Sequence, residues 1–214
     1  MPSLLFDTRD APLDPHRGWA LDGRFELGLP AFAGPLPGAA PFWRTLVGAQ
    51  GYIRLATAHL WRLEAGDYVG GDLVLALSLS YDAAGPIGAG GFVPSSETFA
   101  YGGDFSVRGL PKDASRAAIE ALAAATASAE LRLYLLRLGF GTLQLAGFVD
   151  LGTVAGSSDG LFVQTTCTAG PALRYVTPVG PLSLAWGLPM HMAPALRDVA
   201  PPHGRLHFSF GYAF

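Results

Sequence analysis

The stretch Asp72–Asp82, DLVLALSLSYD, decides the fold, because large apolar residues occupy every second position in it. The apolar set is Leu73, Leu75, Leu77, Leu79 and Tyr81. Successive side chains of a β-strand point to opposite faces, so a period of two is typical of a strand and not of a helix. The stretch therefore predicts a strand with one apolar face and one face of small or polar residues.

The same alternation recurs along the chain. It is clear in Gly18–Leu29, and the last stretch, Arg205–Phe214, alternates five large apolar residues with polar or small ones. The predicted strands are 3–9, 18–29, 43–56, 72–82, 129–138, 142–152, 162–176, 181–188 and 204–214. Prolines and glycines cluster between them, as expected for connectors. The sequence therefore predicts an all-β protein built from antiparallel strands.

One segment departs from this pattern. Asp113–Ser128, DASRAAIEALAAATAS, is rich in alanine, and Ile119 and Leu122 are three positions apart. Asp113 could cap a short helix there. An irregular entry of small residues into the next strand explains the segment nearly as well.

Composition leaves two kinds of all-β protein open. Half of the 214 residues are hydrophobic and 14% are charged, against about 25% charged in ordinary soluble domains. No uninterrupted apolar run reaches the about 18 residues that a transmembrane helix needs. The chain could be a soluble, glycine-rich sandwich or barrel. It could also be a membrane β-barrel, whose apolar residues fall at alternate positions.

The second face of the strands favours the membrane barrel. A soluble sheet shows charged residues on its outer face, whereas these strands carry mostly Gly, Ala, Ser and Thr there. Several predicted strands reach ten residues or more, and soluble strands average about five or six. Long strands with an aromatic-rich face and a face of small polar residues fit lipid outside and a narrow lumen inside.

Other classes of function find little support. The net charge is −3 and there is no basic run, so no nucleic-acid partner is expected. A single cysteine, Cys167, excludes an internal disulfide and a cysteine-based metal cluster. There is no Gly-x-Ser-x-Gly, His-Glu-x-x-His or phosphate-binding loop. We therefore expect neither an enzyme nor a bound metal or cofactor.

The start of the chain and the number of strands raise a further question. The first twenty residues contain no apolar signal-peptide core, and an outer-membrane protein needs one. Bacterial single-chain barrels have an even number of strands, whereas nine are predicted. Either the chain is a fragment, or its start is mis-assigned, or the membrane interpretation is wrong. The odd strand count points to a missing upstream part.

Four local patterns carry a family resemblance. They are FDTRDAPLDPHRGW at Phe6–Trp19, GGDFSVRGL at Gly102–Leu110, FVDLG at Phe148–Gly152, and GPALRYVTPVGPLSLAWG at Gly170–Gly187. In this order they resemble the bacterial surface antigen superfamily, which includes BamA, TamA and the two-partner secretion transporters. The final aromatic strand resembles the signal by which the assembly machinery recognises its clients. That signal comprises Phe208, Phe210, Tyr212 and Phe214.

The resemblance implies an architecture and a function. Residues 1–214 would be the C-terminal part of a sixteen-stranded barrel in the outer membrane of a Gram-negative-type bacterium, preceded by further strands and periplasmic modules. Its partners would be the lipid bilayer and client outer-membrane or secreted polypeptides, which it would insert or translocate at a lateral seam. The alternatives are a passive structural or pore-type barrel and a soluble lipocalin-like binder.

The resemblance also implies a site. A loop at about 83–128 would fold into the lumen and carry Val107, Arg108 and Gly109, with Leu110 where the family has an aromatic residue. The loop would meet a wall formed by Phe148, Asp150 and Gly152. Alternation independently places Asp150 on the face away from the apolar residues. Glu130 and Arg132 share this lumenal parity and could extend a charge network. We expect Arg108 and Asp150 to pair directly.

Overall fold

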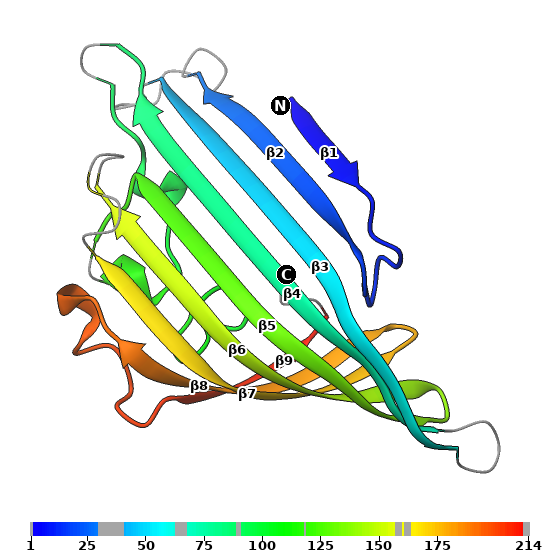
Figure 1. Cartoon of the computed structure of the whole chain (residues 1–214). Helices are drawn as coiled ribbons and strands as arrows, with labels where there is room; N and C mark the ends of the chain where they lie inside the picture. Colours follow the sequence, from blue (N-terminus) through cyan, green and yellow to red (C-terminus); the bar gives the residue numbers. More distant parts are fainter. Residues whose placement is uncertain are drawn as a thin grey trace.

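The computed structural model describes residues 2–29, 41–62, 68–88, 91–117, 119–156, 160 and 164–211. These residues form one curved sheet of nine antiparallel strands in sequence order (Figure 1). The strands are β1 (Ser3–Asp7), β2 (Gly18–Gly28), β3 (Phe42–Arg62), β4 (Tyr68–Pro86), β5 (Ala123–Leu138), β6 (Gly141–Ala155), β7 (Thr165–Thr177), β8 (Gly180–His191) and β9 (Arg205–Phe210). Within the described residues β1 and β9 each pair with one neighbour, so the sheet is open.

The nine predicted strands are confirmed, but several are longer than predicted. β3 and β4 form one long hairpin in which Phe42 pairs with Pro86. The alanine-rich segment becomes strand from Ala123 onward, because β4 and β6 offer backbone partners on both sides of it. Among its described residues, the helical part is a 3-10 turn, Ala114–Ala117. The loop between β4 and β5 therefore spans 87–122, less than the predicted 83–128.

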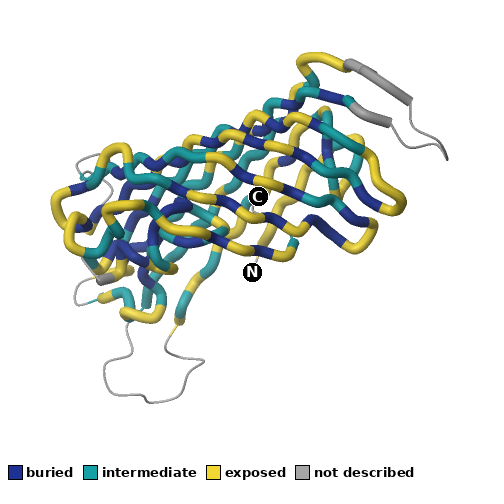
Figure 2. The backbone as a smooth tube through the Cα atoms, turned by 90° about the horizontal axis from the view of Figure 1, so that it is seen from below, coloured by how far each residue is buried: buried dark blue, intermediate teal, exposed yellow. Residues whose placement is uncertain are grey.

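The two faces of the sheet differ as the alternation predicts. On β4, Leu77 and Leu79 are 39% and 55% exposed, whereas Val74 and Ala76 are fully buried. Figure 2 shows this alternation of exposed and buried positions along neighbouring strands. Within the described segments no helix is long and apolar enough to cross a membrane. Tyr212 and Phe214, the last two residues of the predicted terminal signal, lie outside the described residues.

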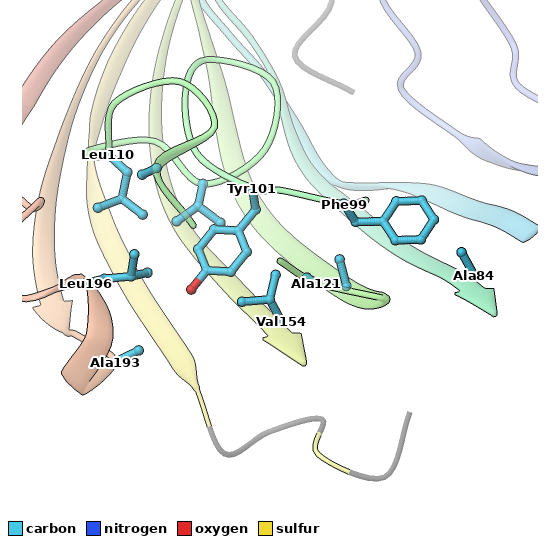
Figure 3. Packing of buried hydrophobic residues seen from close by; sticks show 11 residues of the cluster. Ala84, Phe99, Tyr101, Leu110, Ala121, Val154, Ala193 and Leu196 are labelled. Atoms are coloured by element: carbon cyan, nitrogen blue, oxygen red, sulfur yellow. The ribbon is translucent and has the colours of Figure 1, made fainter. Parts of the chain in front are cut away.

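The described part of the loop 87–122 folds back against the inner face of the sheet. Its Tyr101, Val107 and Leu110 are buried in an apolar cluster that includes Val154 of β6 and Leu196 of the connector between β8 and β9 (Figure 3). A Cβ atom at Gly152 would lie 2.6 Å from Val107 Cγ2 and 2.9 Å from Tyr101 Cδ2. A glycine at position 152 thus lets the loop pack directly on β6, which brings its tip to the wall.

Candidate functional site

Arg108, at the tip of the loop, contacts Asp150 of β6 through a two-pronged pair. Its Nε donates to Asp150 Oδ2 and its Nη2 donates to Asp150 Oδ1, each at 2.8 Å. The backbone N–H of Arg108 also donates to Asp150 Oδ2, at 3.0 Å. Both side chains are almost completely buried. The fork of the guanidinium matches the carboxylate, so this arrangement fixes both the position and the orientation of the loop tip.

A second carboxylate, that of Glu130 on β5, also binds the Arg108 guanidinium. Arg108 Nη1 donates to Glu130 Oε2 at 2.5 Å, and Nη2 also donates to Ser128 Oγ at 3.2 Å. The strand register explains this grouping, because Ser128 pairs with Asp150 and Glu130 pairs with Phe148. The guanidinium carbon lies 3.6 Å from the centre of the Phe148 ring, within the range of a cation–π contact.

Two more arginines, Arg132 on β5 and Arg174 on β7, also bind the Glu130 carboxylate. Arg132 Nε donates to Glu130 Oε1 at 2.8 Å and Arg174 Nη1 donates to the same oxygen at 2.5 Å. Three guanidinium groups thus face the two carboxylates of Glu130 and Asp150. Removing one partner from a buried ion pair leaves an uncompensated charge, which is the costly state. Burial alone would lower the pKa of Arg108, but the hydrogen bonds and charge of Asp150, together with Glu130, outweigh it and raise that pKa.

The loop tip also contacts the last two strands. The Gly109 N–H donates to Nε2 of His207 on β9 at 2.8 Å, and His207 Nδ1 is hydrogen-bonded to Asp104 of the loop. Gly109 has φ +95°, and a Cβ there would lie 2.8 Å from the carbonyl oxygen of Gly187 on β8. Glycine is favoured at this φ because it has no Cβ. The loop therefore bridges the β5–β6 wall and the terminal strand.

The structure brings most of the predicted site residues together. Val107, Arg108 and Gly109 form the loop tip, while Phe148, Asp150, Gly152, Glu130 and Arg132 form the wall against it. Phe208 and Phe210 lie on the other face of β9, where they are 68% and 59% exposed. They are therefore separate from the loop contact.

Three contributors were missed from the sequence: Ser128, Arg174 and His207. The signal for Ser128 was missing, because it lies in the alanine-rich segment that was not predicted to be a strand. Alternation places Arg174 and His207 on the inner faces of their strands. It does not reveal which residues meet across the lumen, because that depends on register and curvature.

The arrangement holds a loop in place. Both carboxylates at its centre are occupied by guanidinium groups. In the portion of the chain that the structure describes, no group of three or more His, Cys, Asp or Glu side chains could hold a metal ion.

Comparisons with known proteins give two matches. The sequence profile of the Omp85 superfamily domain matches residues 2–214. Among solved structures, the chain resembles BamA from Haemophilus ducreyi lacking POTRA domains 1–3, with a TM-score of 0.67 and 19% sequence identity. The match covers 97% of this chain and 41% of that chain, so it establishes the fold and spans less than half of the relative. A comparison with curated protein sequences finds no match.

Proposed function

The chain belongs to the Omp85 superfamily, and on that premise we propose that it forms part of an outer-membrane barrel that inserts or translocates other polypeptides. Its partners are the lipid bilayer of a Gram-negative-type outer membrane and client outer-membrane or secreted proteins. The proposal concerns the assembled barrel, of which residues 1–214 are the C-terminal part.

The outer face of the sheet supports a membrane location. Large apolar side chains from most strands are exposed on it, among them Trp19, Ile53, Leu79, Leu145, Leu173 and Trp186. β2 to β8 span 11 to 21 residues, and a tilted strand needs about 9–11 to cross the hydrocarbon core. Large apolar side chains exposed on most strands of a sheet are costly in water and favourable in lipid.

The open edges support a barrel completed by other strands. Hydrocarbon does not tolerate unpaired backbone groups, and β1 and β9 each leave one edge unpaired within the described residues. We propose that strands preceding β1 complete the barrel and that periplasmic modules precede them. The seam then lies between β9 and the first strand of that barrel, where an exposed edge can pair with a strand of the client.

The observation that carries the proposal is the connection from Arg108 to the terminal strand. Asp150 and Glu130 hold Arg108, and the adjacent Gly109 donates to His207 on β9. A loop fixed in this way sets the position of β9, and therefore the geometry of the seam that receives the client. The mechanism requires pairing of backbone edges and no covalent chemistry.

The proposal is tested by replacing Arg108 in the intact protein. Arg108→Ala should reduce the yield of a newly inserted client at least tenfold, while the matched control Arg197→Ala, at an exposed position, should leave it unchanged. Both variants must first show the same amount of protein in the membrane. If Arg108→Ala raised ion conductance but left client insertion intact, the passive pore would be the correct function.

A further inference from the structure

The turn between β1 and β2 crosses the inner face of the sheet. It comprises residues 8–17, and its Asp14 carboxylate accepts a hydrogen bond from the Tyr134 hydroxyl of β5 at 2.7 Å. The Gln144 side-chain amide of β6 donates to the same carboxylate at 3.2 Å. β3 and β4 lie between β2 and β5 in the sheet. Backbone pairing alone therefore does not place Asp14 there; the turn must fold inward over two strands.

His16 connects the same turn to β4 through Asp72. Its Nδ1 lies 2.5 Å from Asp72 Oδ2, and its Nε2 lies 3.8 Å from Asp14 Oδ2. The imidazole ring also lies against the Tyr134 ring, with centroids 4.5 Å apart. Asp72 is held in turn by Thr57 at 2.5 Å and by Arg54 at 3.2 Å. One histidine thus lies between two carboxylates that belong to different elements.

The turn contacts a different part of the wall from the Arg108 site. Tyr134 and Gln144 are close to the turn that joins β5 and β6, whereas Ser128 and Asp150 lie further toward the other ends of these strands. The two sites share the strands β5 and β6, and at the Arg108 site Arg174 donates to Glu130. Glu130 in turn accepts from Arg108.

A turn that merely connects two strands would leave its carboxylates in water. Here Pro15 is buried and the Asp14 side chain is 22% exposed. A carboxylate removed from water requires donors in compensation, and Tyr134 and Gln144 supply them from strands far away in sequence. Reduced exposure together with specific donors indicates that the turn is packed against these strands.

We propose that Asp14 and His16 are positioning residues, which dock the β1–β2 turn across the inner face and brace the wall strands β4, β5 and β6. The brace acts at the end of the wall remote from Arg108, so the wall is held at both ends. The inference rests on the proposed function only in that this wall carries the Arg108 site.

The contacts of His16, one of the two positioning residues, depend on pH. The interaction with Asp14, and then the hydrogen bond with Asp72, raises the pKa of His16 above its ordinary value, against the effect of burial. Burial of Asp14 opposes its ionisation, but the interaction with His16 and the hydrogen bonds from Tyr134 and Gln144 outweigh this and lower its pKa. The charged or titratable groups around His16 are Asp10 and Asp14 on the turn, Arg54 on β3, Asp72 on β4 and Tyr134 on β5.

The direction of the pH effect follows from these shifts. Below about pH 6.5, the ordinary pKa of histidine, His16 is charged whether the turn is docked or free, and its contacts contribute fully. As pH rises through the raised pKa of the docked state, His16 loses its charge and its attraction to the two carboxylates. Asp14 stays ionised throughout, so the hydrogen bonds from Tyr134 and Gln144 persist. We therefore expect partial release of the turn at high pH.

The test measures the distance from the turn to the wall. Spin labels at Leu13→Cys and Phe140→Cys, both exposed, report it by pulsed electron paramagnetic resonance in the intact protein in lipid vesicles, with Cys167→Ser as background. One narrow distance is expected at pH 6, with a second, longer population at pH 8.5. Asp14→Asn should show the longer population at both pH values. His16→Gln should remove the pH dependence, and His203→Gln, an exposed control, should behave as wild type.

Wild-type distances in both Asp14→Asn and His16→Gln would overturn the inference, and so would a pH dependence that persists in His16→Gln. Neither result bears on the proposed function, because the readout involves no client. Conversely, if Arg108→Ala left client insertion unchanged, the proposed function would fail while the turn distances could still follow the pattern above. Client insertion should also fall in Asp14→Asn without any change in the amount of protein in the membrane.

Discussion

Arg108 and Asp150, which are 42 residues apart in the chain, meet through two N–H···O contacts of 2.8 Å each in the interior of the curved sheet. Each also has a second partner. Arg108 donates to Glu130, and Asp150 accepts from Ser128 Oγ at 2.6 Å. The pair is therefore the centre of a larger network, which determines how the network should respond when one member is removed.

Removing Arg108 should cost more than removing Asp150. Arg108→Ala leaves Asp150 with Ser128 but without a cation, whereas Asp150→Ala leaves Arg108 paired with Glu130. Breaking a buried pair costs about 3–5 kcal/mol, and we expect Arg108→Ala to fall in this range and Asp150→Ala below it. Unfolding of the intact protein by urea in detergent would measure both.

The double variant tests whether the two residues act as a pair. Arg108→Ala with Asp150→Ala should be little worse than Arg108→Ala alone, because the second change removes a carboxylate that has already lost its cation. Arg108→Lys should restore only part of the stability, since an ammonium group lacks the fork. Simple additivity of the two single effects would contradict direct pairing.

The outer and inner faces of one strand should tolerate different substitutions. Phe208 is exposed on the outer face of β9, and Ser209 is nearly buried on the inner face. Arginine at mid-bilayer on the lipid face of a barrel costs about 2–4 kcal/mol, so Phe208→Arg and Leu77→Arg should each block membrane integration of the intact protein. Ser209→Asn should integrate normally. The shift in gel mobility between heated and unheated samples reports integration, and identical behaviour of the two classes would reverse the assignment of the faces.

Gly187 should be as sensitive as Arg108, although it carries no side chain. A Cβ at this position would lie 2.4 Å from the Gly109 nitrogen and 2.5 Å from the Arg108 carbonyl carbon. These are backbone atoms, so Gly187→Ala must displace the loop tip. We expect a loss of client insertion similar to that of Arg108→Ala. Gly147→Ala on β6 is the matched control, since a Cβ there meets nothing within 4 Å, and an equal effect in the two would exclude the steric explanation.

Residues 1–214 expressed alone should not give a stable monomer in detergent. β1 and β9 each leave one edge of the described sheet unpaired, and such groups are costly in an apolar medium. We expect aggregates, or dimers that pair edge to edge, in light scattering after gel filtration. A monodisperse, protease-resistant monomer would show that the open sheet is stable without further strands.

The alternation of apolar and small residues was sufficient to predict the strands and the two faces of each, because the side-chain period of a strand is two whatever surrounds it. Asp150, Glu130 and Arg132 could be placed on the inner face for this reason alone. The pairing of Arg108 with Asp150 was also predicted, but from family resemblance rather than from the residues. The alanine-rich segment remained undecided between helix and irregular strand entry.

Only the tertiary structure shows which side chains and segments contact one another across the sheet. The alanine-rich segment is strand because β4 and β6 lie on either side of it with backbone groups to pair. Arg174 reaches Glu130, and His207 reaches Gly109, because curvature turns separate inner faces toward one another. Asp14 meets Tyr134 across 120 residues of sequence. A period of two assigns each side chain to a face, but its partner depends on strand register, sheet curvature and the inward folding of turns, which are properties of the whole sheet.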